Sequence, residues 1–264
     1  MPTVIIYSIL LLLGASVGSF LNVCVFRIPK NESIIFPASH CQACGHPIAW
    51  RDNIPVLSFL LLKGRCRDCR APISSQYFWV EVSCLVLFFL FYGVFGLTVR
   101  GAVYLVLSLA LLTESLIDWK HQIIPDGITL PGIVIGLLVS GLFPELHGES
   151  VWFRGFLSGG LGVLFGGGVL YAVGTISERI MKKETMGGGD VKLLAMIGAV
   201  LGWQGVLGAL FISSFFGSVV GIILRWRRGQ EKIPFGPYLA LGTFLYLFFG
   251  QRMIDAYVGI FKLS

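Results

Sequence analysis

The sequence predicts an all-α polytopic membrane protein with about eight transmembrane helices and a small cytoplasmic insertion that resembles a zinc ribbon. Of its 264 residues, 55% are hydrophobic and only 13% are charged, whereas a soluble globular domain has about 25% charged residues. The apolar residues form long runs, and a run of roughly 18 or more is long enough to span a bilayer. The composition therefore excludes an ordinary soluble enzyme, and the 21 Phe, 6 Trp and 8 Tyr exclude a disordered chain.

Apolar runs mark the expected membrane helices. The second and third runs are separated only by a few residues ending at Arg100, and the sixth and seventh by the turn at residues 202–205, so each pair should form a tight antiparallel hairpin. The shorter runs must tilt or lie inside the bundle. The eight expected spans are residues 3–26, 78–97, 101–117, 127–143, 156–176, 192–202, 206–224 and 235–251.

The distribution of basic residues predicts which side of the membrane each loop occupies. With the N-terminus outside, 16 of the 20 Lys and Arg residues fall on one face, and the other four are Arg100, Arg154, Arg252 and Lys262. Basic loops of membrane proteins are cytoplasmic, so the one long hydrophilic segment is predicted to be cytoplasmic. The net charge of +6 is then explained by the basic residues that orient the chain in membrane lipid, and it does not indicate a nucleic-acid partner.

That hydrophilic segment divides the chain into a first transmembrane helix (1–26), a cytoplasmic module (27–76) and a larger transmembrane domain (77–264). A module of about 50 residues is too small for a hydrophobic core alone to stabilise it as a rule. We therefore expect a metal or a covalent cross-link within it.

Two C-x-x-C pairs supply such a cross-link, because four thiolates in this pattern close the tetrahedral shell of a structural Zn²⁺ ion. Two disulfides are the alternative, although thiols stay reduced in the cytoplasm. His40 or His46, which flank the first pair, could also replace one thiolate. The predicted zinc ligands are Cys41, Cys44, Cys66 and Cys69.

Acidic residues beside apolar runs are the candidates for chemistry, because ionisable groups at membrane depth are costly and usually functional. Asp118 follows the third run, and Asp190 precedes the sixth after three glycines, 187–189. On the predicted topology both lie on the cytoplasmic side, so the two carboxyl groups can meet. Two adjacent aspartates share one proton, so that the anion activates water and the acid protonates a peptide carbonyl. The pair is thus predicted to hydrolyse peptide bonds.

Each acid also has a structural interpretation. Asp190 precedes a helical run and Asp126 lies in a Pro-Asp-Gly segment, so either could cap a helix or stabilise a turn. Glu114 lies one turn before Asp118 on the same helical face, where it could tune the pair or hydrogen-bond to a neighbour. The competing function is a transporter or scaffold in which the two aspartates relay ions, although the internal repeat typical of transporters is not evident.

These residues together resemble the prepilin peptidase family, the leader peptidases and N-methyltransferases of type IV pilus and type II secretion systems. The resemblance covers nearly the whole chain. Its motifs are Gly18-Ser-Phe-Leu-Asn22-Val, the two C-x-x-C pairs with Asn53-Ile-Pro-Val-Leu-Ser between them, Glu81, the segment Asp118-x7-Asp126, Gly187-Gly-Gly-Asp190-Val-Lys-Leu-Leu and Pro234-Phe-Gly-Pro-Tyr-Leu-Ala-Leu.

The resemblance implies that Asp118 and Asp190 are the catalytic pair of a G-x-G-D intramembrane aspartyl protease in the bacterial cytoplasmic membrane. It implies that the substrate is a prepilin or pseudopilin, whose short basic leader is cut at the cytoplasmic face. The new N-terminal residue, commonly Phe, is then methylated from S-adenosylmethionine. In the family the zinc module is associated with methylation, so residues 27–76 are expected to serve that activity and residues 77–264 to form the peptidase domain.

The residues alone identify no pocket for the methyl donor, because no glycine-rich methyltransferase loop opens a strand-to-helix unit. Four acids on or beside the long loop could face a sulfonium or an amine, namely Glu32, Asp52, Asp68 and Glu81. Each is equally consistent with a solvated or capping role. Near the membrane face, Asn22 and Glu81 are the candidate contacts for substrate or donor.

Overall fold

The computed structural model describes residues 2–182, 187–228 and 234–262, and within these ranges every secondary-structure element is a helix. This confirms the expected all-α class. Lys183 and Lys232, which enter the predicted charge distribution, lie outside the described residues. The α-helices are α1 (Pro2–Arg27), α2 (Leu57–Leu61), α3 (Ser75–Phe95), α4 (Val99–His121), α5 (Asp126–Leu142), α6 (Trp152–Met181), α7 (Gly188–Arg228) and α8 (Gly236–Lys262), and the 3-10 helices are η1 (Ile28–Lys30), η2 (Trp50–Asp52) and η3 (Pro144–His147).

Five helices of the described chain are long and apolar enough to cross a membrane: α1, α3, α4, α6 and α7. The helix α5 is apolar but shorter. Large apolar side chains point outward along these helices, and Leu12, Leu164 and Phe211 are 67%, 70% and 72% exposed. Such extensive apolar exposure would be unfavourable in water, and it suits a lipid environment. The chain is therefore a multi-pass membrane protein.

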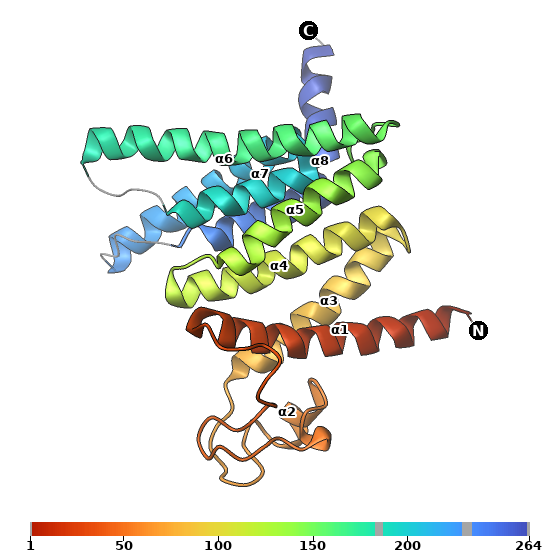
Figure 1. The fold of residues 1–264 in the computed structure, drawn as a ribbon, viewed down its shortest axis with the longest axis vertical. Helices are drawn as coiled ribbons and strands as arrows, with labels where there is room; N and C mark the ends of the chain where they lie inside the picture. The colour runs from red at the N-terminus through yellow and green to blue at the C-terminus, as the bar shows by residue number, and fades with distance from the viewer. Residues whose placement is uncertain (1, 183–186, 229–233, 263–264) are drawn as a thin grey trace. The chain divides into compact units, whose positions relative to one another are not determined.

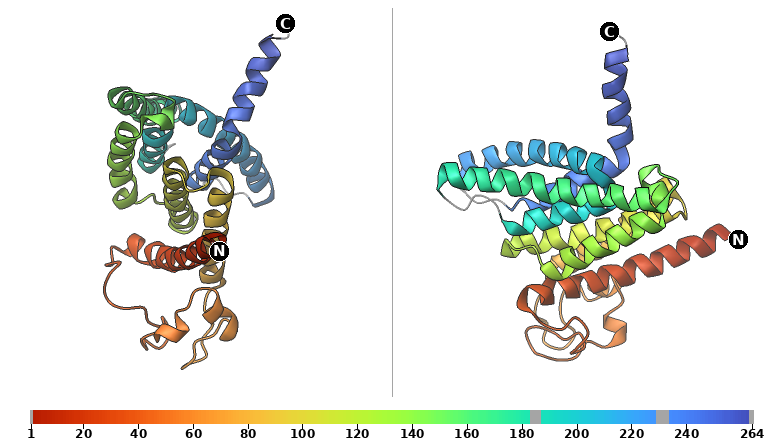
Figure 2. Two further views of the ribbon diagram at one scale, coloured as in Figure 1. Left: turned by 90° about the vertical axis from the view of Figure 1, so that its right-hand side faces the viewer. Right: turned by 45° about the horizontal axis from the view of Figure 1, so that its top comes forward.

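The expected spans correspond to the helices with one difference in continuity. Spans 127–143 and 235–251 fall in α5 and α8, and spans 192–202 and 206–224 both fall in α7. Gly202 interrupts α7 with φ 69° and ψ −177°, and glycine adopts such a positive φ without steric cost. Figure 1 shows the chain reversing there, so that the two halves of α7 run in opposite directions, as the turn at residues 202–205 predicted, and Figure 2 shows the same helices in two further views.

The chain forms two compact units, Met1–Leu105 and Val106–Ser264, and the boundary lies within α4. In the first unit α1 packs against α3, and the hydrophilic segment with α2 connects them (Figure 1). The two helices approach closely at Gly18, where a Cβ would lie only 2.8 Å from the Cα of Glu81. In the second unit α7 packs against α5, α6 and α8.

A stripe of glycines allows α6 to approach its neighbours. Residues three and four apart lie on the same face of a helix, and a Cβ on any of these four glycines would overlap backbone atoms of α5, α7 or the segment between α5 and α6. Gly162 and Gly198 of α7 face one another directly, each against the carbonyl of the other. In lipid, helices associate through close packing of this kind, since no hydrophobic force drives them together. The stripe consists of Gly155, Gly159, Gly162 and Gly166.

Replacing Gly162 with Leu should therefore destabilise the second unit by about 3 kcal/mol or more, because the added side chain cannot enter without separating α6 from α7. The control is Gly160→Ala, since a Cβ at Gly160 meets nothing within 4 Å. It should leave the unfolding midpoint unchanged or raise it slightly, because alanine favours a helix over glycine by up to about 1 kcal/mol. Thermal unfolding in detergent measures both variants, and a wild-type midpoint for Gly162→Leu would contradict this packing.

Candidate active site and metal centre

The structure brings the two predicted aspartates together in the second unit. Asp118 lies in the last turn of α4, and Asp190 lies in the first turn of α7. Their carboxyl groups are close enough to interact electrostatically. Asp118 is buried, with 5% of its surface exposed, whereas Asp190 is partly exposed. The pair thus combines one sheltered carboxyl group with one that an approaching chain can reach.

A backbone amide of α8 donates a hydrogen bond to Asp118. The N–H of Gly236, the first residue of α8, donates to Asp118 Oδ2 at 2.9 Å. The next two residues offer Asp118 no free N–H, because Pro237 has none and the N–H of Tyr238 is bonded to the carbonyl of Phe235 at 3.0 Å. A Cβ on Gly236 would lie 2.7 Å from Asp118 Oδ2, so a side chain there would displace the carboxylate. The Pro-Phe-Gly-Pro motif was visible in the sequence, but nothing in its pattern indicated this partner.

Asp190 does not cap α7. The helix begins at Gly188, and the backbone N–H of Asp190 donates to the carbonyl of Gly187 at 3.1 Å. In the described part of the chain its carboxyl group accepts no hydrogen bond. Of the three glycines before it, Gly189 is required by close packing, because a Cβ there would lie 2.8 Å from the Cβ of Ile124, whereas Gly188 has open space around it.

Two further acids flank the pair. Glu114 is completely buried one turn before Asp118, and both of its carboxyl oxygens lack a hydrogen-bond partner among the described residues. Of the two roles considered for Glu114, the structure therefore does not support the hydrogen bond to a neighbour. Asp126, at the start of α5, instead pairs with Lys192, whose Nζ lies 2.7 and 2.9 Å from the two carboxylate oxygens. This exposed ion pair joins α5 to α7 beside Asp190.

Four thiols form a candidate metal centre in the first unit. Their Sγ atoms all lie within 4.8 Å of one another, and the Cys41 and Cys69 sulfurs are 3.8 Å apart. A disulfide requires about 2.05 Å, whereas a tetrahedron with metal–sulfur bonds of about 2.3 Å has sulfurs about 3.8 Å apart. The cluster could therefore hold a metal ion, and it consists of Cys41, Cys44, Cys66 and Cys69.

The two cysteine pairs fold in the same way. The N–H of Cys41 donates to the carbonyl of His46, and the N–H of Cys66 donates to the carbonyl of Ala71, both at 2.9 Å. Each short loop directs two thiols to the same side. The turn after the first pair needs a positive φ, which Gly45 supplies at 71°. Local backbone bonding therefore forms the site, and the spacing of the cysteines was sufficient to predict it.

Charged and polar contacts support this module. Nε of Arg67 donates to the Asp52 carboxylate oxygens at 3.0 and 2.8 Å, and this hydrogen bonding holds the pKa of Asp52 below its usual value. Backbone N–H groups of Cys44 and Ala43 lower the pKa of the Cys41 thiol to about 6. A lowered pKa favours the thiolate, which is the form that binds metal.

Comparison with known proteins shows the family. Residues 12–95 match the Bacterial Peptidase A24 N-terminal domain, and residues 105–222 match the Type IV leader peptidase family. A Pseudomonas aeruginosa protein named Prepilin leader peptidase/N-methyltransferase is 36% identical, and the alignment covers 94% of this chain and 92% of that protein. The chain belongs to the type IV leader peptidase family. Relatives of the same name from Pseudomonas putida and Aeromonas hydrophila are 37% and 34% identical over 91% and 96% of this chain, and over 90% and 93% of their own. No solved structure matches the chain.

Membership in the type IV leader peptidase family makes this chain an enzyme, which sets aside the transporter or scaffold alternative. The family match over 105–222 contains both aspartates, and the match over 12–95 contains the four cysteines together with Asn22 and Glu81. Gly236 lies beyond both matched ranges.

Proposed function

We propose that this enzyme removes the short basic leader from type IV prepilins and type II secretion pseudopilins at the cytoplasmic face of the bacterial cytoplasmic membrane. It then methylates the new N-terminal amine with S-adenosylmethionine. The observation that carries the proposal is the meeting of Asp118 and Asp190 from separate helices. The names of the relatives support both activities, and the basic residues support an N-terminus outside with the cysteine module in the cytoplasm.

The contacts of the pair indicate a division of labour. Asp118 receives the Gly236 N–H at the start of α8, and a hydrogen-bond donor at a helix N-terminus stabilises an anion. Asp190 has no such donor among the described residues, so we assign to it the shared proton. Anionic Asp118 takes a proton from water as the water oxygen attacks the peptide carbonyl carbon, and Asp190 protonates the carbonyl oxygen. Collapse of the resulting diol transfers a proton to the leaving amine.

Three regions of the chain would divide the two activities. Residues 1–26 form a membrane helix, residues 27–76 serve methylation, and residues 77–264 form the aspartyl peptidase. The methyl donor supplies an electrophilic methyl group on a sulfonium. The exposed backbone at Gly187 and Gly188 leaves room for the extended peptide that a protease needs beside Asp190.

The direct test uses purified full-length protein in lipid vesicles, a type IV prepilin and S-adenosylmethionine, with products identified by mass spectrometry. We expect loss of the leader followed by a gain of one methyl group. Cleavage should proceed at neutral pH, because two aspartates that share a proton keep one acid and one base available there. An intact prepilin after prolonged incubation, or activity confined to strongly acidic solution, would count against the proposal.

We further propose that the four thiols bind a structural Zn²⁺ ion. Purified protein should contain about one zinc per chain, and the double variant Cys41→Ser, Cys66→Ser should lose it, because two thiolates cannot complete the shell. His40→Ala and His46→Ala are the controls and should retain zinc, since neither side chain belongs to the cluster. Elemental analysis with thiol titration measures the result.

Methylation should fall before cleavage in the double cysteine variant if the module serves methyl transfer. Simultaneous loss of both activities would instead assign the metal a role in folding of the whole chain. Less than about half an equivalent of zinc in wild-type protein that has no free thiols would contradict the metal site.

A further inference from the structure

A second buried polar cluster lies in the first unit, where α1, α3 and the hydrophilic segment meet. Glu81 of α3 is 7% exposed and Asn22 of α1 is 3% exposed. Glu81 Oε2 accepts the N–H of Val56 at 2.6 Å, and Asn22 Nδ2 donates to the carbonyl of Tyr77 at 3.0 Å. The aspartate chemistry uses neither residue. Their burial side by side therefore needs another explanation.

The backbone geometry directs these two side chains toward one another. Gly18 packs against Glu81 and Asn22 bonds to Tyr77, so α1 and α3 are antiparallel here. Side chains lean toward the N-terminus of their own helix, so Glu81 leans toward the level of Asn22, and Asn22 leans toward the level of Gly18. The side chain of Ser19, one turn before Asn22, also approaches the Glu81 carboxyl group. The Glu81 carboxyl group is thus beside the face of α1 that carries Asn22.

One hydrogen-bond acceptor of this cluster is left without a donor. Asn22 Oδ1 is buried and has no hydrogen-bond partner among the described residues. Glu81 forms no ion pair there. The nearby Arg27 is buried but donates to the carbonyls of Ser33 and Pro37, at 2.9 and 2.7 Å. A buried acceptor without a donor is unfavourable, and a ligand with N–H groups and a positive charge would donate to Asn22 Oδ1 and pair with the Glu81 carboxylate.

The hydrophilic segment is also shaped around this cluster. Val56, whose N–H donates to Glu81, has φ 64° and ψ −53°, a conformation that β-branched residues rarely adopt. Strained backbone of this kind persists where the surrounding structure holds it, and it is common at functional sites. The loop that connects the two cysteine pairs is therefore tied to the buried carboxyl group of the membrane helix.

We propose that Asn22 and Glu81 hold the primary amine that becomes methylated, the N-terminal α-amino group of the processed pilin-like chain. This assignment rests on the proposed function. In the step, Glu81 accepts one proton from the ammonium, and the amine lone pair attacks the methyl carbon of S-adenosylmethionine. The carbon–sulfur bond breaks and its electron pair stays on sulfur, which leaves the neutral thioether. Asn22 Oδ1 accepts a second N–H and orients the amine. The sulfonium group of S-adenosylmethionine has no N–H, so it cannot donate to Asn22 Oδ1.

S-adenosylmethionine also carries a primary ammonium on its amino-acid end, so the test must separate the two sources. Wild-type protein in lipid nanodiscs is titrated with a peptide of the mature pilin N-terminus, with the same peptide acetylated at its amine, and with S-adenosylhomocysteine. We expect the free-amine peptide to bind at least about tenfold more tightly than the acetylated one, because acetylation removes the charge and two N–H donors. Glu81→Gln and Asn22→Leu should abolish that preference and change S-adenosylhomocysteine affinity by less than about twofold.

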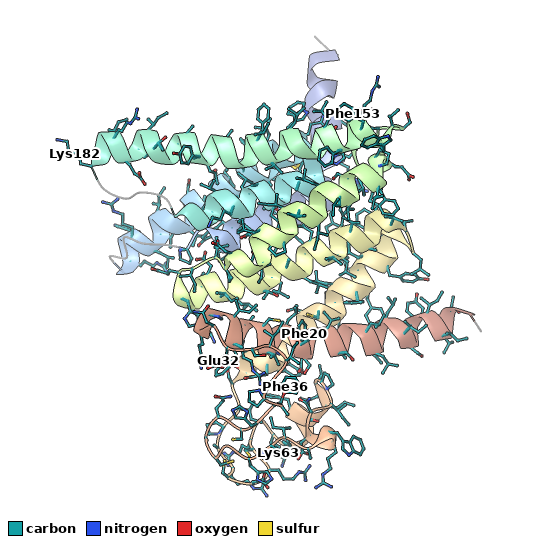
Figure 3. All side chains as sticks on the ribbon, in the orientation of Figure 1. Phe20, Glu32, Phe36, Lys63, Phe153 and Lys182 are labelled. Atoms are coloured by element: carbon teal, nitrogen blue, oxygen red, sulfur yellow. The ribbon has the colours of Figure 1, made fainter. Side chains whose placement is uncertain are left out.

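The matched control is Glu32→Gln, an exposed acid of the same unit (Figure 3), which should keep the preference for the free amine. Glu81→Asp retains a carboxylate on a shorter side chain and should restore part of the preference that Glu81→Gln loses. Zinc content verifies that each variant is folded. In methylation assays with the already processed peptide, the ratio of methylated to bound peptide should fall by at least about tenfold in Glu81→Gln.

The outcomes separate this assignment from the proposed function. Failure of wild-type protein to cleave prepilin and to methylate the supplied peptide would refute the function itself. The assignment alone would be overturned if wild-type protein methylates the peptide and the variants Glu81→Gln and Asn22→Leu prefer the free amine as strongly as wild type does. A selective loss of S-adenosylhomocysteine affinity would also overturn it, because that loss would place the donor, and not the substrate amine, at these acceptors.

Discussion

Asp118→Asn and Asp190→Asn are each expected to reduce prepilin cleavage by roughly 10²- to 10⁴-fold, the usual contribution of a general acid or base. Asparagine keeps the size of the side chain but can neither take a proton from water nor give one to the peptide carbonyl. The Gly236 N–H can still donate to the amide oxygen at position 118, so the fold should be preserved. Initial rates of leader removal, measured by mass spectrometry in lipid vesicles, test both variants.

Two controls make this result specific. Asp126→Asn removes an acid from the same region, but its ion pair with Lys192 is exposed, and exposed pairs contribute about 0–1 kcal/mol, so cleavage should change by less than about fivefold. Both aspartate variants should still methylate a peptide that has already been processed, since we propose that the first unit carries that activity. Near wild-type cleavage by either variant would rule out the assigned pair.

Gly236→Ala is expected to lower kcat for cleavage by about 100-fold, because the new Cβ, 2.7 Å from Asp118 Oδ2, must push the carboxylate out of position. Displacements of about 1 Å in a catalytic group have effects of this size. KM should change far less, since Gly236 contacts Asp118 and makes no direct contact with the substrate in the proposed mechanism. Steady-state kinetics with a fluorescent prepilin peptide separates the two constants.

Gly217→Ala in α7 is the matched control, because its Cβ would meet neighbours at ordinary distances of 3.6 Å or more. It should cleave at close to the wild-type rate and unfold at the same temperature as Gly236→Ala. A Gly236→Ala enzyme with an unchanged kcat would show that the Gly236 contact does not position Asp118.

The membrane helices could be predicted from the sequence because the length of an apolar run is a local property. The expected break between the second and third spans corresponds to the short link between α3 and α4, and the glycine turn at Gly202 interrupts α7 as expected. The cysteine cluster was predictable for a similar reason. Each C-x-x-C pair forms its own tight loop, so its spacing specifies the local geometry before any tertiary contact forms.

The contacts of the candidate site could not be predicted in the same way. Gly236 is 118 residues from Asp118, and Lys192 is 66 residues from Asp126. A sequence pattern shows that each residue is a glycine, an acid or a base, but not which helix end is adjacent. The capping roles considered for Asp190 and Asp126 were reasonable locally, but α7 begins before Asp190 and the Asp126 carboxylate pairs with Lys192 of another helix. The lack of a donor to Asn22 Oδ1 among the described residues likewise depends on how α1 packs against α3.

The amino-acid sequence was enough to predict the all-α membrane class, the eight apolar segments, the cluster of four thiols and the candidate aspartates, because composition, run length and ligand spacing express chemistry within short stretches of chain. Tertiary packing was needed to establish that Asp118 receives the amide of α8, that Asp190 accepts no hydrogen bond in the described chain, and that Asn22 Oδ1 is buried without a donor among the described residues. These properties depend on hydrogen-bond donors and acceptors from distant segments, and only packing of the helices brings such segments together or keeps them apart.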